Sequence, residues 1–204
     1  MEEQLSEKLT VSLLGRSGCG KGTQAKFVME RLKSQGAVHI STGALLRTLM
    51  QSPTPAGRIT RRIMQQGGLH PSWVAAYTWF KILFEERGAE RHLIFDGAPR
   101  RLWEAKLLDD VMRWHGRPLP LCVYIDVRRR EAMRRLLARG RADDTAAAIK
   151  NRLDYFQKDV VPVLQYYKRQ KRLLRVDGEQ SPEKVWHEID AVLSKRLGNK
   201  WPRR

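Results

Sequence analysis

The sequence predicts an α/β protein in three layers, with a five-stranded parallel sheet covered by helices on both faces. Short apolar runs have the length and composition of buried strands at 10–14, 37–40, 92–95, 121–125 and 172–176. Helical patterns lie between these runs and after the last one, at 21–34, 71–87, 102–115, 128–138, 143–170 and 182–197. Strand and helix therefore alternate, which favours parallel strands joined by right-handed crossovers.

The first predicted strand leads into a glycine-rich loop. Residues 15–21 read GRSGCGK and have the spacing G-x-x-x-x-G-K. The glycines let successive backbone N–H groups point inward at a helix N-terminus, where they can hold phosphate. Lys21 adds a mobile positive charge, and the hydroxyl that usually follows it comes one place later, at Thr23. Strand, loop and helix together predict a P-loop fold that binds a nucleotide.

Two regions interrupt the alternation of strand and helix. Residues 41–70 read as short helical pieces broken by SPTPAG and QQGGLHP, which suits a small mobile cap. Residues 139–144, RGRADD, form a compact charged hinge between two helices. We expect both regions to close over a substrate. Because 204 residues suit one domain, we expect a single domain with a cap at 41–70 and a short lid at about 138–144.

The formal charge of +17 is the unusual bulk property of the chain. A protein this basic attracts polyanions, among them nucleotides and nucleic acid. The sequence has no eighteen-residue apolar run, and the N-terminal MEEQLSEKLT lacks the basic start of a signal peptide, so we expect no membrane partner. Two cysteines are too few for a disulfide framework or a four-ligand zinc site, and they favour a cytoplasmic location.

The form Gly-Lys-Gly-Thr-Gln at 20–24 is where the sequence begins to resemble one family in particular, the adenylate kinases. Further motifs similar to those of this family follow in order between about Leu9 and Ile189. They are HISTGALLR at 39–47, GGLHP at 67–71, LIFDGAPR at 93–100, RLLARGRADD at 135–144 and VDGEQSPEKV at 176–185. The resemblance implies reversible phosphoryl transfer from ATP to AMP, giving two ADP.

The resemblance also implies a role for each residue that matches a family motif. On the ATP side these residues are Gly15, Gly18, Cys19, Gly20, Lys21, Gly22, Thr23, Arg135, Arg139 and Gln180. On the side of the acceptor nucleotide they are Thr42, Arg47, Gly68, Leu69, His70, Gly97, Arg100, Glu104, Arg141 and Arg152. The residues expected to act on the moving phosphoryl group are Lys21, Arg100, Arg139, Arg141 and Arg152. Asp96 is expected to hold Mg²⁺ through water.

The chemistry explains why the motifs are rich in cations. Phosphoryl transfer between nucleotides requires alignment and charge neutralisation, which planar guanidinium groups supply by binding two oxygens at once. The attacking phosphate oxygen is already ionised, so no general base is needed, and we expect the five histidines to be structural or solvated rather than catalytic. Asp143 and Asp144 are expected to orient the lid arginines or to cap a helix. A six-residue lid without cysteines excludes structural zinc.

Five positions depart from the family pattern. Ser17 replaces a proline, Ala44 an aspartate, Ala98 a phenylalanine, Arg101 a threonine and Glu104 the glutamine that reads the acceptor base. A carboxylate only accepts hydrogen bonds, so it faces the N1 lone pair of adenine unfavourably and suits the two donors of guanine. We therefore expect a weakened preference for adenine, with GMP or a pyrimidine monophosphate as the alternative acceptor to AMP.

A reading from another class stays open beside the kinase. The high charge, the run RRREAMRR at 128–135 and the tail KWPRR at 200–204 would also suit a non-catalytic, basic protein that binds nucleotides or nucleic acid. Weak non-specific binding of nucleic acid could accompany the enzyme as well. We expect the kinase, with MgATP as donor, AMP as first acceptor and a monomeric state like that of the monomeric family members.

Overall fold

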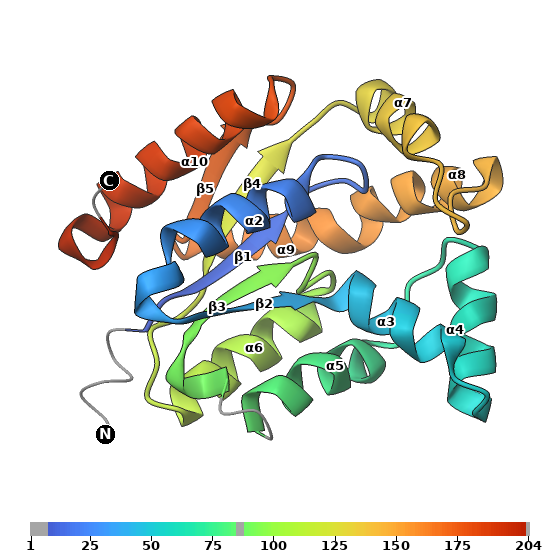
Figure 1. The fold of residues 1–204 in the computed structure, drawn as a ribbon, viewed down its shortest axis with the longest axis horizontal. Coiled ribbons are helices and arrows are strands. Elements are labelled where there is room, and N and C mark those ends of the chain that lie inside the picture. Colours follow the sequence, from blue (N-terminus) through green and yellow to red (C-terminus); the bar gives the residue numbers. More distant parts are fainter. Residues whose placement is uncertain (1–7, 85–87, 203–204) are drawn as a thin grey trace.

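The computed structural model describes residues 8–84 and 88–202, and within them it has one five-stranded, fully parallel sheet. The strand order is β2-β3-β1-β4-β5 (Figure 1). The strands are β1 (Thr10–Leu14), β2 (Ala37–Ser41), β3 (His92–Asp96), β4 (Leu121–Asp126) and β5 (Leu173–Asp177). The predicted fold class is confirmed, and each predicted strand matches an observed one to within a residue at either end.

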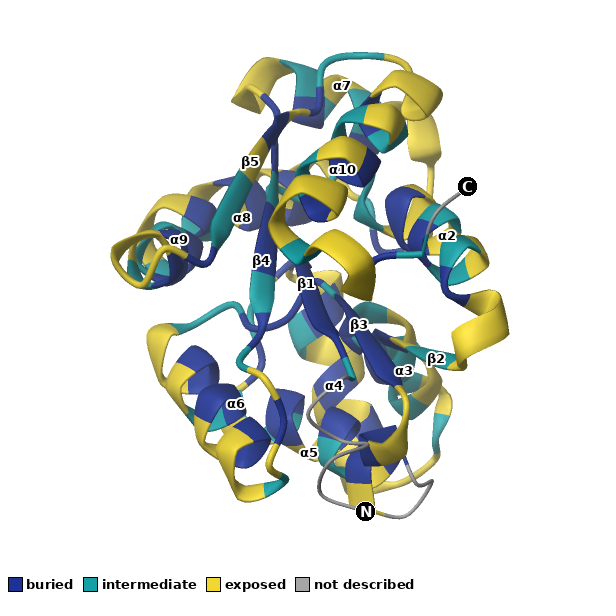
Figure 2. Ribbon diagram, turned by 90° about the vertical axis from the view of Figure 1, so that its left-hand side faces the viewer, coloured by how far each residue is buried: buried dark blue, intermediate teal, exposed yellow. Residues whose placement is uncertain are grey.

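Helices cover both faces of the sheet, as the alternation of strand and helix predicts. On one face, α2 (Lys21–Arg31) packs against β1, β2 and β3, and α10 (Pro182–Leu197) packs against β5 and α2. On the other face lie α5 (Ser72–Phe84), α6 (Leu102–Trp114) and α9 (Val161–Arg169). Figure 2 shows the buried sheet running between these two helical layers.

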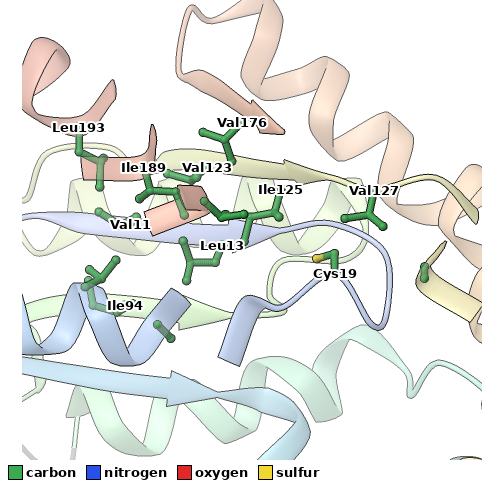
Figure 3. Packing of buried hydrophobic residues seen from close by; sticks show 14 of the residues in the cluster. Val11, Leu13, Cys19, Ile94, Val123, Ile125, Val127, Val176, Ile189 and Leu193 are labelled. Atoms are coloured by element: carbon green, nitrogen blue, oxygen red, sulfur yellow. The ribbon is translucent and has the colours of Figure 1, made fainter. Parts of the chain in front are cut away.

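Alternating side chains of the strands build apolar clusters on both faces of the sheet. Val11 and Leu13 of β1 point to the side of α10, where they pack with its Ile189 and Leu193 (Figure 3). Leu14, one residue on, belongs to the cluster on the opposite face with α9. Because side chains alternate along a strand, β1 and β3 each contribute to clusters on both faces and are buried along nearly their whole length.

Four further helices lie beyond the carboxyl end of the sheet. They are α3 (Thr42–Gln51), α4 (Pro55–Gln65), α7 (Arg129–Arg139) and α8 (Ala146–Tyr155). Hydroxyl side chains cap three of them: Ser41 accepts from the N–H of Ala44, Thr54 from that of Gly57, and Thr145 from that of Ala148. These N-terminal hydrogen bonds fix where α3, α4 and α8 begin.

Helix boundaries are where the predictions were least accurate. The helix predicted at 143–170 is helical from Ala146 to Arg169, but it is not one regular α-helix: α8 continues into a π-helical turn, Phe156–Val160, which continues into α9. Pro162 at the start of α9 has no N–H to donate, so the hydrogen-bond ladder cannot run through unbroken. The helix predicted at 21–34 ends at Arg31, and the last residues of the one predicted at 71–87 lie outside the described part.

His92, the first residue of β3, links folding stability to pH. Its Nδ1 accepts the N–H of Leu9 at 2.9 Å, and burial, with Lys8 and Arg117 adding to it, lowers the pKa of His92 to about 4 from 6.5. Between these two pH values the unfolded chain binds a proton that the folded chain does not. The free energy of unfolding should therefore fall by about 2 to 3 kcal/mol as pH drops from 6.5 to 4.

The variant His92→Asn tests this dependence, because asparagine keeps an acceptor for the Leu9 amide and does not titrate. Urea denaturation of both proteins at several values of pH between 4 and 7 measures the difference. In the variant, the free energy of unfolding should vary less steeply with pH, because the contribution of His92 is missing. Parallel pH profiles for the two proteins would show that His92 is not the titrating group.

Candidate active site

A cleft of about 550 Å³ lies at the carboxyl ends of the strands, between the loop after β1 and the helices α3, α4, α7 and α8. It brings together residues from distant parts of the chain, from Ser17 to Tyr155. The sequence-predicted site residues that line it are Gly18, Gly20, Lys21, Gly22, Thr23, Arg47, Gly68, His70, Asp96, Arg100, Arg135, Arg139, Arg141 and Arg152. Most of the predicted site therefore shares one cleft.

Other predicted residues do not line this cleft. Gly15 and Gly97 border a small adjoining hollow together with Lys21 and Arg100. Cys19 is buried in the core under the loop. Thr42 is buried, and its Oγ1 has no partner among the described residues. The remaining residues outside the lining are Leu69, Glu104 and Gln180.

The glycine loop wraps the start of α2 and packs closely on α7. Gly18 has φ +86°, and a Cβ there would lie 2.6 Å from the carbonyl oxygen of Ala132, so only glycine fits. Gly20, the residue before α2, is left-handed as well, with φ 97°. The Lys21 ammonium donates to the carbonyls of Gly15 and Arg16 at 3.0 and 2.9 Å. Lys21 and the loop residues Gly18 and Gly20 therefore line the cleft at the N-terminus of α2, the positive end of that helix.

Arg100 lies in the loop between β3 and α6 and is held at three points. Its Nε donates to the carbonyl of Gly97 at 2.7 Å, and its Nη1 donates to the Tyr155 hydroxyl at 3.0 Å. Its backbone N–H donates to Glu104 Oε2 at 2.7 Å. The guanidinium group thus reaches the cleft from a loop that three separate contacts stabilise.

Arg139 of the lid and Arg152 of α8 are paired with the two lid aspartates. Arg139 contacts both oxygens of Asp144, at 2.8 and 2.7 Å, and Arg152 contacts Asp143 and Asp144 at 2.6 Å each. Burial would raise the pKa of Asp144, but Arg139 and Arg152 outweigh it, so this pKa lies below its ordinary value. The contacts agree with the expected orienting role of the aspartates, while the cap of α8 is Thr145.

Arg47 of the cap and Arg141 of the lid concentrate positive charge in the cleft. Burial lowers the pKa of Arg47, and the like charges of Arg141 and Arg139 lower it further. Arginine nevertheless stays protonated at neutral pH. An anion in this space would relieve the repulsion, so the arrangement is suited to phosphate.

Asp96, at the end of β3, is a carboxylate that lines the cleft beside the start of α2. Its Oδ2 accepts from Ser41 Oγ at 3.3 Å and lies 3.7 Å from His39 Nε2. Burial would raise the pKa of Asp96, but the His39 contact and the charges of Lys21 and Arg100 outweigh it, so the pKa lies below its ordinary value. An ionised, oriented carboxylate at the edge of a phosphate-binding cleft fits Mg²⁺, which takes few protein ligands and several waters.

A metal site formed by protein side chains alone would need several ligands close together. Within residues 8–84 and 88–202, no group of three or more histidine, cysteine, aspartate or glutamate side chains is placed to hold a metal ion.

Sequence reasoning missed several residues of the cleft, notably His39, Ser41 and Tyr155. A signal for the first two was present, because β2 and β3 are parallel and Ser41 pairs in register with Asp96. Side chains that end neighbouring parallel strands meet at one edge of the sheet. Tyr155 carried no such signal, since its place depends on how α8 packs beside the loop of Arg100.

Two of the positions singled out in the sequence make contacts that their motifs did not imply. Arg101 donates to Asp159 Oδ1 and to the carbonyl of His70, both at 3.2 Å. Gln180 donates to Glu188 at 3.0 Å. The role of Gln180 beside the donor base, like the roles of the other site residues, stays a prediction.

Comparison with known proteins identifies the family of this chain. The family profile described as adenylate kinase matches residues 13–172. Adenylate kinase 1 of Nostoc sp. PCC 7120 is 36% identical over 184 residues, covering 88% of this chain and 96% of that protein. The adenylate kinase of Thermus thermophilus is 37% identical over 187 residues, covering 90% and 96%. That of Phenylobacterium zucineum is 35% identical over 194 residues, covering 91% and 98%.

These matches include the glycine loop, the cap, the loop of Arg100 and the lid, which are the segments that form the cleft. The relatives are covered almost from end to end, so the likeness is not limited to a shared phosphate-binding loop. The chain therefore belongs to the adenylate kinase family.

Proposed function

We propose that this chain reversibly transfers the γ-phosphoryl group of ATP to AMP, forming two molecules of ADP. The observation that supports the proposal most is the convergence of cations from distant parts of the chain on one cleft above the glycine loop. These cations are Lys21, Arg47, Arg100, Arg135, Arg139, Arg141 and Arg152. A protein that only bound one nucleotide would not need charge on every side of the phosphate path.

The cleft suits a transfer between two bound nucleotides. The loop amides and Lys21 would hold the donor phosphates at the N-terminus of α2, and Arg100 would hold the acceptor phosphate from the opposite side. Arg139 and Arg152 would exchange their contacts with Asp143 and Asp144 for contacts with the moving phosphoryl group. Aligned phosphates and neutralised charge are what this reaction chiefly requires.

Asp96 is the residue that would hold Mg²⁺, with Ser41 and His39 orienting its carboxylate. When bound, the ion neutralises phosphate charge and helps to align the donor. The contact with His39 and the charges of Lys21 and Arg100 together hold the pKa of Asp96 below its ordinary value.

The test is a coupled assay of ADP formation from ATP with AMP, GMP, CMP or UMP as acceptor. We expect ADP formation with AMP, and we expect it to be lost in Lys21→Ala. Binding of ATP without turnover of any monophosphate would instead support the non-catalytic alternative. Turnover of GMP with AMP inactive would support the altered acceptor. None of the contacts within the described residues favours either alternative.

Other expectations stay predictions beside this proposal. They are the monomeric state, the cytoplasmic location and the weak binding of nucleic acid. Both cysteines, Cys19 and Cys122, are free and buried, which suits a reducing compartment. Across the described residues, every helix is too short or too polar to cross a membrane.

A further inference from the structure

Glu104 lies in the first turn of α6 and is bonded to the chain that precedes the helix. Its side chain is 4% exposed, and its Oε2 accepts the backbone N–H of Arg100 at 2.7 Å. Arg101, which occupies the N-cap position of α6, provides no side-chain cap. The carboxylate of Glu104 therefore satisfies a backbone donor at the positive end of the helix, where a negative charge is favourable.

The other contacts of Arg100 are at its guanidinium group. Nε donates to the Gly97 carbonyl and Nη1 to the Tyr155 hydroxyl. A Cβ on Gly97 would lie 3.0 Å from Nη2, so the side chain lies close against this glycine. Glu104 is thus the contact that holds the backbone of Arg100, while Gly97 and Tyr155 hold its side chain.

Recognition of an acceptor base would require a different orientation of the Glu104 side chain. The base edge would need carboxylate oxygens directed into the cleft, yet Glu104 is not among the residues that line it, whereas Arg100 and Tyr155 are. One carboxylate oxygen is already committed to a backbone amide. A hydrogen bond to a charged acceptor is roughly twice as strong as one to a neutral acceptor. A glutamine at this position would therefore hold the same amide less firmly.

We propose that Glu104 is a positioning residue that fixes Arg100 against the acceptor phosphate, and that it does not read the acceptor base. The inference rests on the proposed function, because it assigns the acceptor phosphate to Arg100. It replaces the expectation of a GMP preference drawn from the sequence. The departure from the family glutamine then changes how tightly the acceptor phosphate is held and leaves the choice of base to other groups.

Two variants separate positioning from base reading. In Glu104→Gln the oxygen that accepts the amide remains but its charge is gone, so the KM for AMP should rise about 3- to 10-fold. In Glu104→Ala the bond is lost and the KM should rise about 10- to 100-fold. The KM for ATP should stay within twofold of the wild-type value. Where GMP is turned over at all, its KM should rise by the same factor as that for AMP.

Matched controls show whether the effect passes through Arg100. Tyr155→Phe removes the hydroxyl that accepts from Nη1 and should also raise the KM for AMP, with little change in the KM for ATP. Asp110→Asn changes an exposed carboxylate on the same helix and should leave all constants unchanged. Thermal unfolding of every variant separates these shifts from a general loss of stability.

Amide hydrogen exchange supplies a readout that does not depend on activity. The Arg100 amide should be protected in the wild type, less protected in Glu104→Gln and unprotected in Glu104→Ala. Equal protection in all three proteins, or a KM for AMP within twofold of wild type in Glu104→Ala, would overturn the inference. A change of more than tenfold in the AMP to GMP ratio of kcat/KM would overturn it in favour of base reading. If the wild type were inactive while its Arg100 amide was protected, both the proposed function and the role of Arg100 at the acceptor phosphate would be refuted. The hydrogen bond between Glu104 and the Arg100 amide would still be established.

Discussion

Lys21→Ala is expected to lower kcat for ADP formation from ATP and AMP about 10³-fold. Removing one preorganised charge or donor from a developing negative charge typically costs 10²- to 10³-fold, and the Lys21 ammonium lies against the glycine loop itself. The variant loses hydrogen bonds only within its own loop, to the carbonyls of Gly15 and Arg16 and to the sulfur of Cys19, so any effect on folding should be local. Single-turnover kinetics with saturating nucleotides would measure the loss in the chemical step.

Lys33→Ala is the matched control for this experiment. Lys33 is exposed and pairs with Glu30 at 3.5 Å, so its removal takes away the same charge without touching the cleft. We expect its kcat to equal that of the wild type. If both lysine variants lost activity to the same extent, the general charge of the protein would matter more than the position of Lys21.

The largest expected effect on stability comes from Asp109→Ala, at about 3 to 5 kcal/mol of unfolding free energy. Asp109 of α6 is fully buried, forms an ion pair with Arg172 through both oxygens and accepts from the Tyr166 hydroxyl at 2.7 Å. Arg172 is 6% exposed and donates also to the Pro120 carbonyl at 2.8 Å. Loss of Asp109 leaves the arginine charge buried and uncompensated.

Urea denaturation measures this loss, and the double variant Asp109→Leu with Arg172→Met tests its cause. Replacing both charges by apolar side chains should recover most of the lost stability, since no charge then remains buried without a partner. If the double variant were as unstable as Asp109→Ala, the loss would come from packing. Asp110→Asn, next to it but exposed, should change stability by less than about 0.5 kcal/mol.

The strands and the glycine loop could be predicted closely because their signals are local. Runs such as 10–14 are apolar since both sides of a central parallel strand are buried, and the loop needs glycines wherever its backbone is left-handed, as at Gly18 and Gly20. The π-helical turn at 156–160 had one local signal, Pro162, which cannot donate to an α-helical ladder. A proline alone, however, does not distinguish a π-helical turn from a kink or a helix end.

The direction of a side chain was the hardest property of the site to predict. A family motif indicates which residue type stands at position 104, but glutamate there turns to the Arg100 amide, a contact that no spacing in the sequence implies. The places of His39 and Ser41 depend on pairing between strands, because the register of β2 with β3 brings both side chains to Asp96.

The carboxylates of Asp143 and Asp144 have a consequence for the turnover of nucleotides. They form ion pairs with Arg139 and Arg152, as a phosphate would. The positive charges of these guanidinium groups are therefore neutralised whether or not a nucleotide is bound. An arriving phosphate therefore gains only the difference between two sets of ion pairs. Such an exchange favours fast release of ADP, because the carboxylates of Asp143 and Asp144 can re-form their ion pairs with the arginines as the product leaves.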